Sequence, residues 1–196
     1  MQGADGRRHD ILAGAVAGAV AGTLATFAMS TFQRLWMRVF PEPEASLDSL
    51  HPAERGWPES VQAVRQPGRR GPDDATVEAA DRISRQVTGR GLDVEERAVA
   101  GPAMHYLFGA VAGAAYGALA EVAPPVTTGA GLPFGAVVWL AADEIALPLL
   151  GLTPSPEDSP PHRHLLSFSA HGVYGVATEA LRRALRGDSN LDSRFS

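Results

Sequence analysis

Four ionisable side chains lie in long apolar runs of this sequence: His105, Asp143, Glu144 and His171. Placing a charged side chain at the centre of a bilayer costs about 2.5–3.5 kcal/mol on insertion scales. Imidazole and carboxylate groups held close together can bind and release protons, and two of each could also ligate Zn²⁺ or Fe²⁺. These residues therefore point to a proton, ion or metal site, or to hydrogen bonds that only join helices.

The numbering suggests which of these groups meet. Asp143 and His171 are equally distant from residue 157, which lies in the middle of a proline-rich segment. In an antiparallel helical hairpin they would lie at equal depth, because every helical residue rises by the same about 1.5 Å. We predict that they are neighbours in the bundle interior. We expect no metal site, since the sequence has no HExxH or Glu-x-x-His pair, and we assign no catalytic or cofactor-binding residue.

The elements that carry these groups follow from four runs without Asp, Glu, Lys or Arg: 11–33, 98–120, 122–142 and 164–178. A membrane-spanning helix needs about 20 mostly apolar residues, and three of the runs reach that length. The sequence predicts an all-α fold: one membrane domain over residues 1–196, with four transmembrane helices at about 11–36, 101–121, 129–150 and 162–185. The first run exceeds the about 7–15 apolar residues of a signal peptide, so we expect it to remain as a helix.

Glycines recur one turn apart in two of the predicted helices. The first set is Gly14, Gly18 and Gly22, and the second is Gly109, Gly113 and Gly117. Small residues at this spacing let two helix backbones approach closely in lipid. We predict that the helix at 11–36 packs against the helix at 101–121 through these two ridges.

Residues 41–97 differ in composition from the predicted helices around them. They contain six prolines and many charges, which indicates a polar extramembrane insertion. Within it, residues 75–88 favour a short surface helix with a weak apolar stripe of Val77, Ala80, Ile83 and Val87.

Two Tyr-Gly pairs are each followed by a glutamate at the same spacing, Tyr116-Gly117 by Glu121 and Tyr174-Gly175 by Glu179. One interpretation is a duplicated helical hairpin, and the other is chance in a chain rich in Gly and Ala. We expect both glutamates to be exposed to solvent, with Glu179 pairing with a nearby arginine.

Five arginines near the helix ends on the terminal side, against four on the other, predict cytoplasmic termini.

Other classes of function are disfavoured by composition. The net charge of −5 argues against a nucleic-acid partner. The chain has no cysteine, so disulfides and thiol chemistry are excluded. We expect no cofactor. The predicted partner is the lipid bilayer, and the sequence does not decide whether the chain also forms a homo-oligomer.

Three short runs resemble the YagU-like family of bacterial inner-membrane proteins, whose molecular function is unknown. They are residues 105–109, residues 139–144 with Pro148 and Gly151, and residues 171–175. The resemblance implies a helical bundle in the bacterial inner (cytoplasmic) membrane and supplies no reaction. We therefore expect a small, non-enzymatic multi-pass protein that acts through helix packing or oligomerisation. The alternative is a proton- or small-solute-conducting protein that uses the four ionisable groups.

Overall fold

The computed structural model describes residues 2–40, 72–153 and 155–192. Within these ranges the chain is helical and has no strand, which confirms the predicted all-α class. Most of the predicted insertion, residues 41–71, lies outside the described residues.

Two long helices frame the molecule, α1 (Gln2–Val39) and α7 (Pro161–Asp192). Between them in the chain come α3 (Pro72–Thr88) and α4 (Val94–Val122). The segment after α4 consists of a 3-10 turn at Pro124–Thr127, α5 (Leu132–Trp139), a π-helical segment at Leu140–Ala146 and α6 (Leu147–Leu149). A 3-10 turn at Pro156–Asp158 leads into α7.

The helix α4 begins earlier than the predicted residue 101. Asp93 caps its first turn, since the Asp93 carboxylate accepts from the Glu96 backbone N–H and the Glu96 carboxylate accepts from the Asp93 N–H, both at 2.9 Å. This reciprocal capping box satisfies two backbone donors that a helix otherwise leaves without partners. The polar residues before the apolar run are therefore the first turn of the helix and not part of the insertion.

The helix predicted at about 129–150 is one continuous helical stretch in the structure, Leu132–Leu149, but it differs from a regular α-helix over the predicted range in two respects. Its first residues are not helical, because Gly129, Ala130 and Gly131 have positive φ angles of 79°, 54° and 85°. Its second half is π-helical, with the Leu147 N–H donating to the carbonyl of Ala142, five residues back. Pro148 explains the wider turn, since it has no N–H to donate to residue 144 and its ring crowds that carbonyl.

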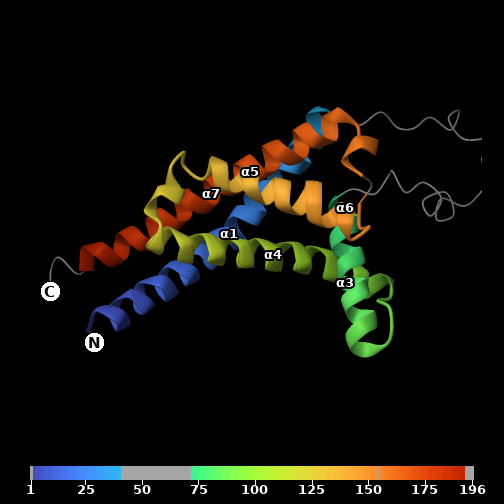
Figure 1. Ribbon diagram of the computed structural model, residues 1–196. Coiled ribbons are helices and arrows are strands. Elements are labelled where there is room, and N and C mark those ends of the chain that lie inside the picture. The colour runs from blue at the N-terminus through green and yellow to red at the C-terminus, as the bar shows by residue number, and fades with distance from the viewer. Residues whose placement is uncertain (1, 41–71, 154, 193–196) are drawn as a thin grey trace, which may run out of the picture.

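The helices pack in the order α4, α1, α7, α5, each against the next. The Tyr116 ring of α4 stacks on the Phe134 ring of α5 at 4.2 Å, which closes the bundle. Both termini lie at one end of the bundle, and α3 and α6 lie at the other (Figure 1).

Glycines set the closest contact in this arrangement. A Cβ added to Gly18 would lie 2.1 Å from the carbonyl oxygen of Gly113, and one added to Gly22 would lie 2.3 Å from that of Gly109. A second close contact joins α5 to α7, where a Cβ on Gly135 would lie 2.2 Å from the carbonyl oxygen of His171. Backbone therefore touches backbone at both helix pairs, as small residues allow in membranes.

The distribution of apolar side chains also fits a bilayer. The buried core combines small or flexible residues, Ala25, Met29 and Ala170, with Tyr174, whereas many large side chains such as Leu24 and Phe27 point outward. Three stretches are long and apolar enough to cross a membrane: Gly6–Val39, Val94–Val122 and Leu132–Leu149. The fourth predicted span lies in α7, which does not meet the same measure of length and hydropathy.

Candidate functional site

The first part of the site joins the π-helical segment to α7 through Asp143. The Ser167 hydroxyl donates a short hydrogen bond to the Asp143 carboxylate. The His171 ring lies behind this pair, with its Nδ1 2.9 Å from the backbone oxygen of Ser167 and 3.8 Å from Oδ2 of Asp143. Asp143 and His171, predicted from the sequence to be neighbours, therefore lie on adjacent helices in one cluster.

The second part lies one turn closer to the 150–160 loop. Glu144 Oε1 lies 2.7 Å from Nδ1 of His164, and Nε2 of the same ring lies 2.9 Å from the backbone oxygen of Pro156. Both ring nitrogens of His164 thus have a polar neighbour, which fixes the orientation of the imidazole. The contact through Nε2 identifies this nitrogen as a donor, because a carbonyl oxygen can only accept.

These four side chains are partly shielded from solvent but not sealed. The exposed fractions are 9% for His171, 12% for Glu144, 23% for Asp143 and 29% for His164. We refer to these residues with Ser167 as the polar seam: Asp143, Glu144, His164, Ser167 and His171. Two pairs of its side chains are hydrogen-bonded, Glu144 with His164 and Asp143 with Ser167, whereas Asp143 and His171 lie 3.8 Å apart.

The structure places the fourth predicted ionisable residue elsewhere. His105 is half-buried near the start of α4, with its ring edge-on to Tyr106 at a centroid distance of 6.4 Å. In its place the seam holds His164, which stands seven residues before His171 on the same face of α7. Within the described residues, no three His, Asp or Glu side chains are arranged to hold a metal ion.

A second charged cluster lies at the terminal end of the bundle, and its burial was not predicted. Glu179 is only 1% exposed. It accepts from the Tyr116 hydroxyl at 3.0 Å, from Arg182 at 2.8 Å and from Arg183. The expectation that Glu179 is exposed to solvent is therefore wrong, although the expected pairing with an arginine is present.

Further ion pairs surround this cluster. The Arg186 guanidinium donates to Glu121 at 2.9 Å and lies 3.9 Å from Asp10. Three helices, α1, α4 and α7, are thus tied together by charge at the terminal end. Breaking one partner of such a buried network leaves an uncompensated charge, which is strongly destabilising.

Polar side chains follow one face of α7 between the two clusters. The Tyr174 hydroxyl donates to the backbone oxygen of Gly109 at 2.7 Å, and the Thr178 hydroxyl donates to the backbone oxygen of Tyr174 at 2.8 Å. With His164, Ser167 and His171 they stand three or four residues apart, which keeps them on one side of the helix. This face of α7 points into the bundle, where each hydroxyl has a partner.

Comparison with known proteins gives the chain a family. Residues 59–180, more than half of the chain, match the family described as "Protein of unknown function (DUF1440)". The inner membrane protein YagU of Escherichia coli (strain K12) is 35% identical over 82 residues, which cover 42% of this chain and 40% of that protein. The chain therefore matches less than half of that relative's length. No solved structure matches the chain.

The family match includes α3, α4 and the whole polar seam, and it leaves out α1. Both findings agree with the resemblance expected from the sequence. Neither the family match nor the match to YagU indicates a reaction or a substrate for this chain. The chain belongs to the DUF1440 family, a family of membrane proteins of unknown function.

Proposed function

We propose that this protein is a four-span proton-conducting membrane protein, with the polar seam as its proton-binding site. The observation that carries the proposal is the pairing of Asp143 and Glu144, on a segment apolar enough to cross a membrane, with His171 and His164 of α7. Ionisable groups inside membrane segments are costly, and they mark ion and proton pathways in pumps and transporters.

The shape of the chain supports four crossings. Both termini lie at the same end of the bundle (Figure 1), which is the arrangement that an even number of crossings would give. Three crossings are supplied by α1, α4 and the segment 132–149, and α7 is the remaining long helix that returns to the terminal end. Its lower hydropathy is explained by polar side chains that face the bundle and by its arginines. We place the termini in the cytoplasm, on the arginine distribution.

A proton could follow the seam from the loop end inward. His164 is the most exposed of its four ionisable members, and it contacts Glu144. The next residue, Asp143, shares its carboxylate with the Ser167 hydroxyl and faces His171. A proton arriving at the Asp143 carboxylate converts it to a neutral acid. The Nδ1–H of His171 already donates to the backbone oxygen of Ser167, so this imidazole would take up a further proton at Nε2. Each step breaks one bond to hydrogen and forms another, with no other reactant.

The π-helical segment adds a reason to assign function here. Single π turns within α-helices occur often at functional sites. In this chain the π turn carries both carboxylates of the seam. A helix whose only task was to span the bilayer would gain nothing from two adjacent acids beside a proline-widened turn.

Proton flux into liposomes tests the proposal. The purified protein is reconstituted with a pH-sensitive dye inside the vesicles, and an inward pH gradient is imposed with valinomycin and potassium to clamp the potential. Flux should exceed that of protein-free vesicles, and Asp143→Asn should abolish the excess while retaining the hydrogen bond from Ser167. Glu95→Gln is the matched control, because Glu95 is exposed in the first turn of α4.

A purely structural seam is the competing hypothesis, and the same variants decide between them. If the seam only joins helices, the wild-type protein gives no flux above protein-free vesicles. The Asp143 variants would then change thermal stability in detergent alone. That outcome would return the function to helix packing or oligomerisation.

A further inference from the structure

The helix α3 lies across the end of the bundle and is transverse to α4 in the view of Figure 1. It packs against α4 and belongs to the family match. Among its described residues, the buried side chains are one small apolar residue, Ala75, and one carboxylate, Asp81, whereas the larger apolar side chains Ile83 and Val87 are exposed. A surface helix of a soluble protein turns its apolar face inward.

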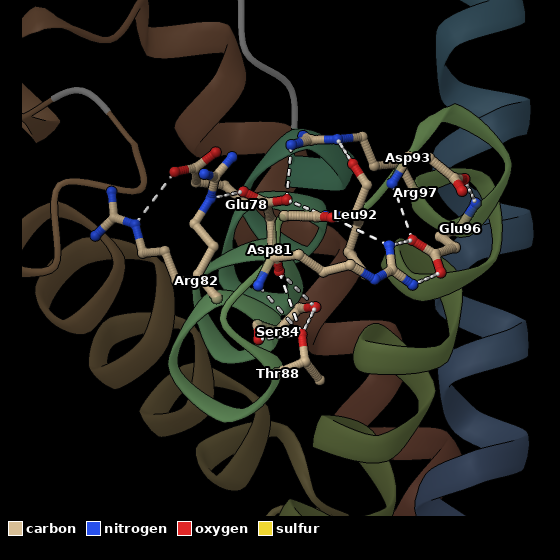
Figure 2. Close-up of polar contacts among 12 residues, drawn as sticks. Glu78, Asp81, Arg82, Ser84, Thr88, Leu92, Asp93, Glu96 and Arg97 are labelled. Carbon is tan, nitrogen blue, oxygen red and sulfur yellow. Dashed lines mark hydrogen bonds and ion pairs between the residues drawn. The ribbon is translucent and has the colours of Figure 1, made fainter.

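Polar side chains of α3 tie this helix to the residues around the start of α4, as Figure 2 shows. Asp81 is buried, with 3% of its surface exposed. Its carboxylate accepts from the Leu92 N–H at 2.7 Å and pairs with Arg85 and Arg97, each at 2.8 Å. The hydrogen bond from Arg85 is the largest influence on Asp81, and it lowers the pKa of this carboxyl although burial opposes the shift.

A second polar contact ties α3 to the end of α6. The Arg82 guanidinium donates to the backbone oxygens of Leu150 at 2.6 Å and Gly151 at 3.4 Å. These carbonyls lie at the end of the segment 132–149, which is apolar enough to span the membrane. The position of α3 is therefore fixed at the level where two spanning segments, α4 and α5 to α6, reach the membrane surface.

The opposite face of α3 is apolar and open. Ala80, Ile83 and Val87 stand three or four residues apart on one side of the helix. Ile83 is 49% exposed and Val87 is 78% exposed. We refer to these three residues as the outer face of α3. The elements that α3 contacts also carry exposed apolar side chains, at Val99 of α4, at Leu149 in α6 and at Leu150 just after it.

We propose that α3 is an interfacial helix whose outer face inserts into the lipid bilayer while its polar face holds it on the bundle. The position of α3 supports lipid as the occupant, because α3 packs on α4 and on the end of the segment 132–149, both of which are apolar enough to cross a membrane and carry exposed apolar side chains. The proposal does not depend on proton conduction. Amphipathic helices with one apolar face lie in this manner at the boundary of headgroups and acyl chains.

The charges near α3 predict which lipids it needs. Arg85 and Arg90 are each 61% exposed, and both are paired, with Asp81 and Glu96 respectively. The arginines of this region are thus already neutralised by protein carboxylates. Binding should therefore be carried by the apolar side chains, and it should not require anionic lipid.

The absence of cysteine permits a clean test with single-cysteine spin labels. Val87→Cys and Gln86→Cys are labelled in the full chain and reconstituted in phosphatidylcholine vesicles, and collisions with oxygen and with a water-soluble nickel chelate are compared. Gln86 is the matched control, as it is exposed on α3 but lies outside the outer face. Neither residue is buried, so both variants should melt at the wild-type temperature in detergent.

The Val87 label should collide more with oxygen than with nickel, and the Gln86 label should show the reverse ratio. Adding anionic lipid should not change either ratio. Equal, nickel-dominated accessibility at both positions would place the outer face in water and overturn the proposal. A Val87 label shielded from both reagents, with spin–spin broadening that grows with protein density, would overturn it in favour of a second copy on this face.

Discussion

The substitution Gly113→Ala measures how much the close approach of α1 and α4 contributes to stability. A Cβ at residue 113 would lie 2.3 Å from the carbonyl oxygen of Gly18 and 2.8 Å from Cα of Gly22, whereas ordinary contact begins at 3.4 Å. The atoms in the way belong to the backbone, so no side chain can rotate to make room. The two helices would have to separate by roughly 1 Å, and overpacking of this kind costs about 1–3 kcal/mol.

Gly172→Ala provides the matched control in the same protein. A Cβ at Gly172 meets only the Leu132 side chain, at 3.7 Å, which is ordinary contact. Alanine favours a helix over glycine by about 1 kcal/mol in water, so this variant should be unchanged or slightly more stable. Reversible unfolding in mild detergent, followed by circular dichroism, should rank Gly172→Ala at or above wild type and Gly113→Ala below it. Equal stability of the two variants would refute the claim that this contact holds the helices together.

Three further predictions concern charged groups. Asp143→Asn should destabilise the protein less than Asp143→Leu, because the amide oxygen still accepts from Ser167. The losses of stability in detergent caused by Asp143→Leu and by His171→Leu should be non-additive by about 0.5–3 kcal/mol in a double-mutant cycle. Glu179→Leu should cost about 3–5 kcal/mol, as it leaves buried arginine charge unpaired, while Glu95→Leu on the surface should cost little in the same assay. Because the pKa of Asp81 lies below its ordinary value, the Asp81 carboxylate stabilises the fold fully above about pH 4, and this stabilisation is lost as the pH falls through the lowered pKa. The chemical shift of the Leu92 amide should follow this loss, and Asp81→Asn should abolish the change.

The parts of the fold that follow simple periodicity could be predicted from the sequence. Glycines one turn apart at Gly14, Gly18 and Gly22 indicate a face that another backbone can touch, and in the structure this face meets the Gly109–Gly117 ridge. Counting residues from the middle of the 150–160 loop indicated the depth of Asp143 and His171. Both arguments need only the regular rise and turn of a helix.

Features that depend on a local break or on a distant partner could not be predicted in this way. The π turn at Leu140–Ala146 depends on how the chain relieves the clash at Pro148. A hydropathy pattern does not indicate which local geometry relieves that clash. The burial of Glu179 depends on Tyr116, which lies on another helix. The position of Glu179 near the end of an apolar run predicted water, but the three donors around it make a buried carboxylate tolerable.

The glycine contacts and the polar seam are two consequences of one arrangement. Gly135 of α5 lies against the backbone of His171, which brings α5 and α7 as close as two helices can come. Side chains of a helix lean toward its N-terminus, so the His171 ring reaches back one turn to Ser167, on the side where Asp143 lies. A bulkier residue at Gly135 would move His171 away from the Asp143 carboxylate, although it would touch neither ring nor carboxylate. The small residues therefore do more than allow packing in lipid: they set the distance across which the seam's carboxylates and imidazoles meet.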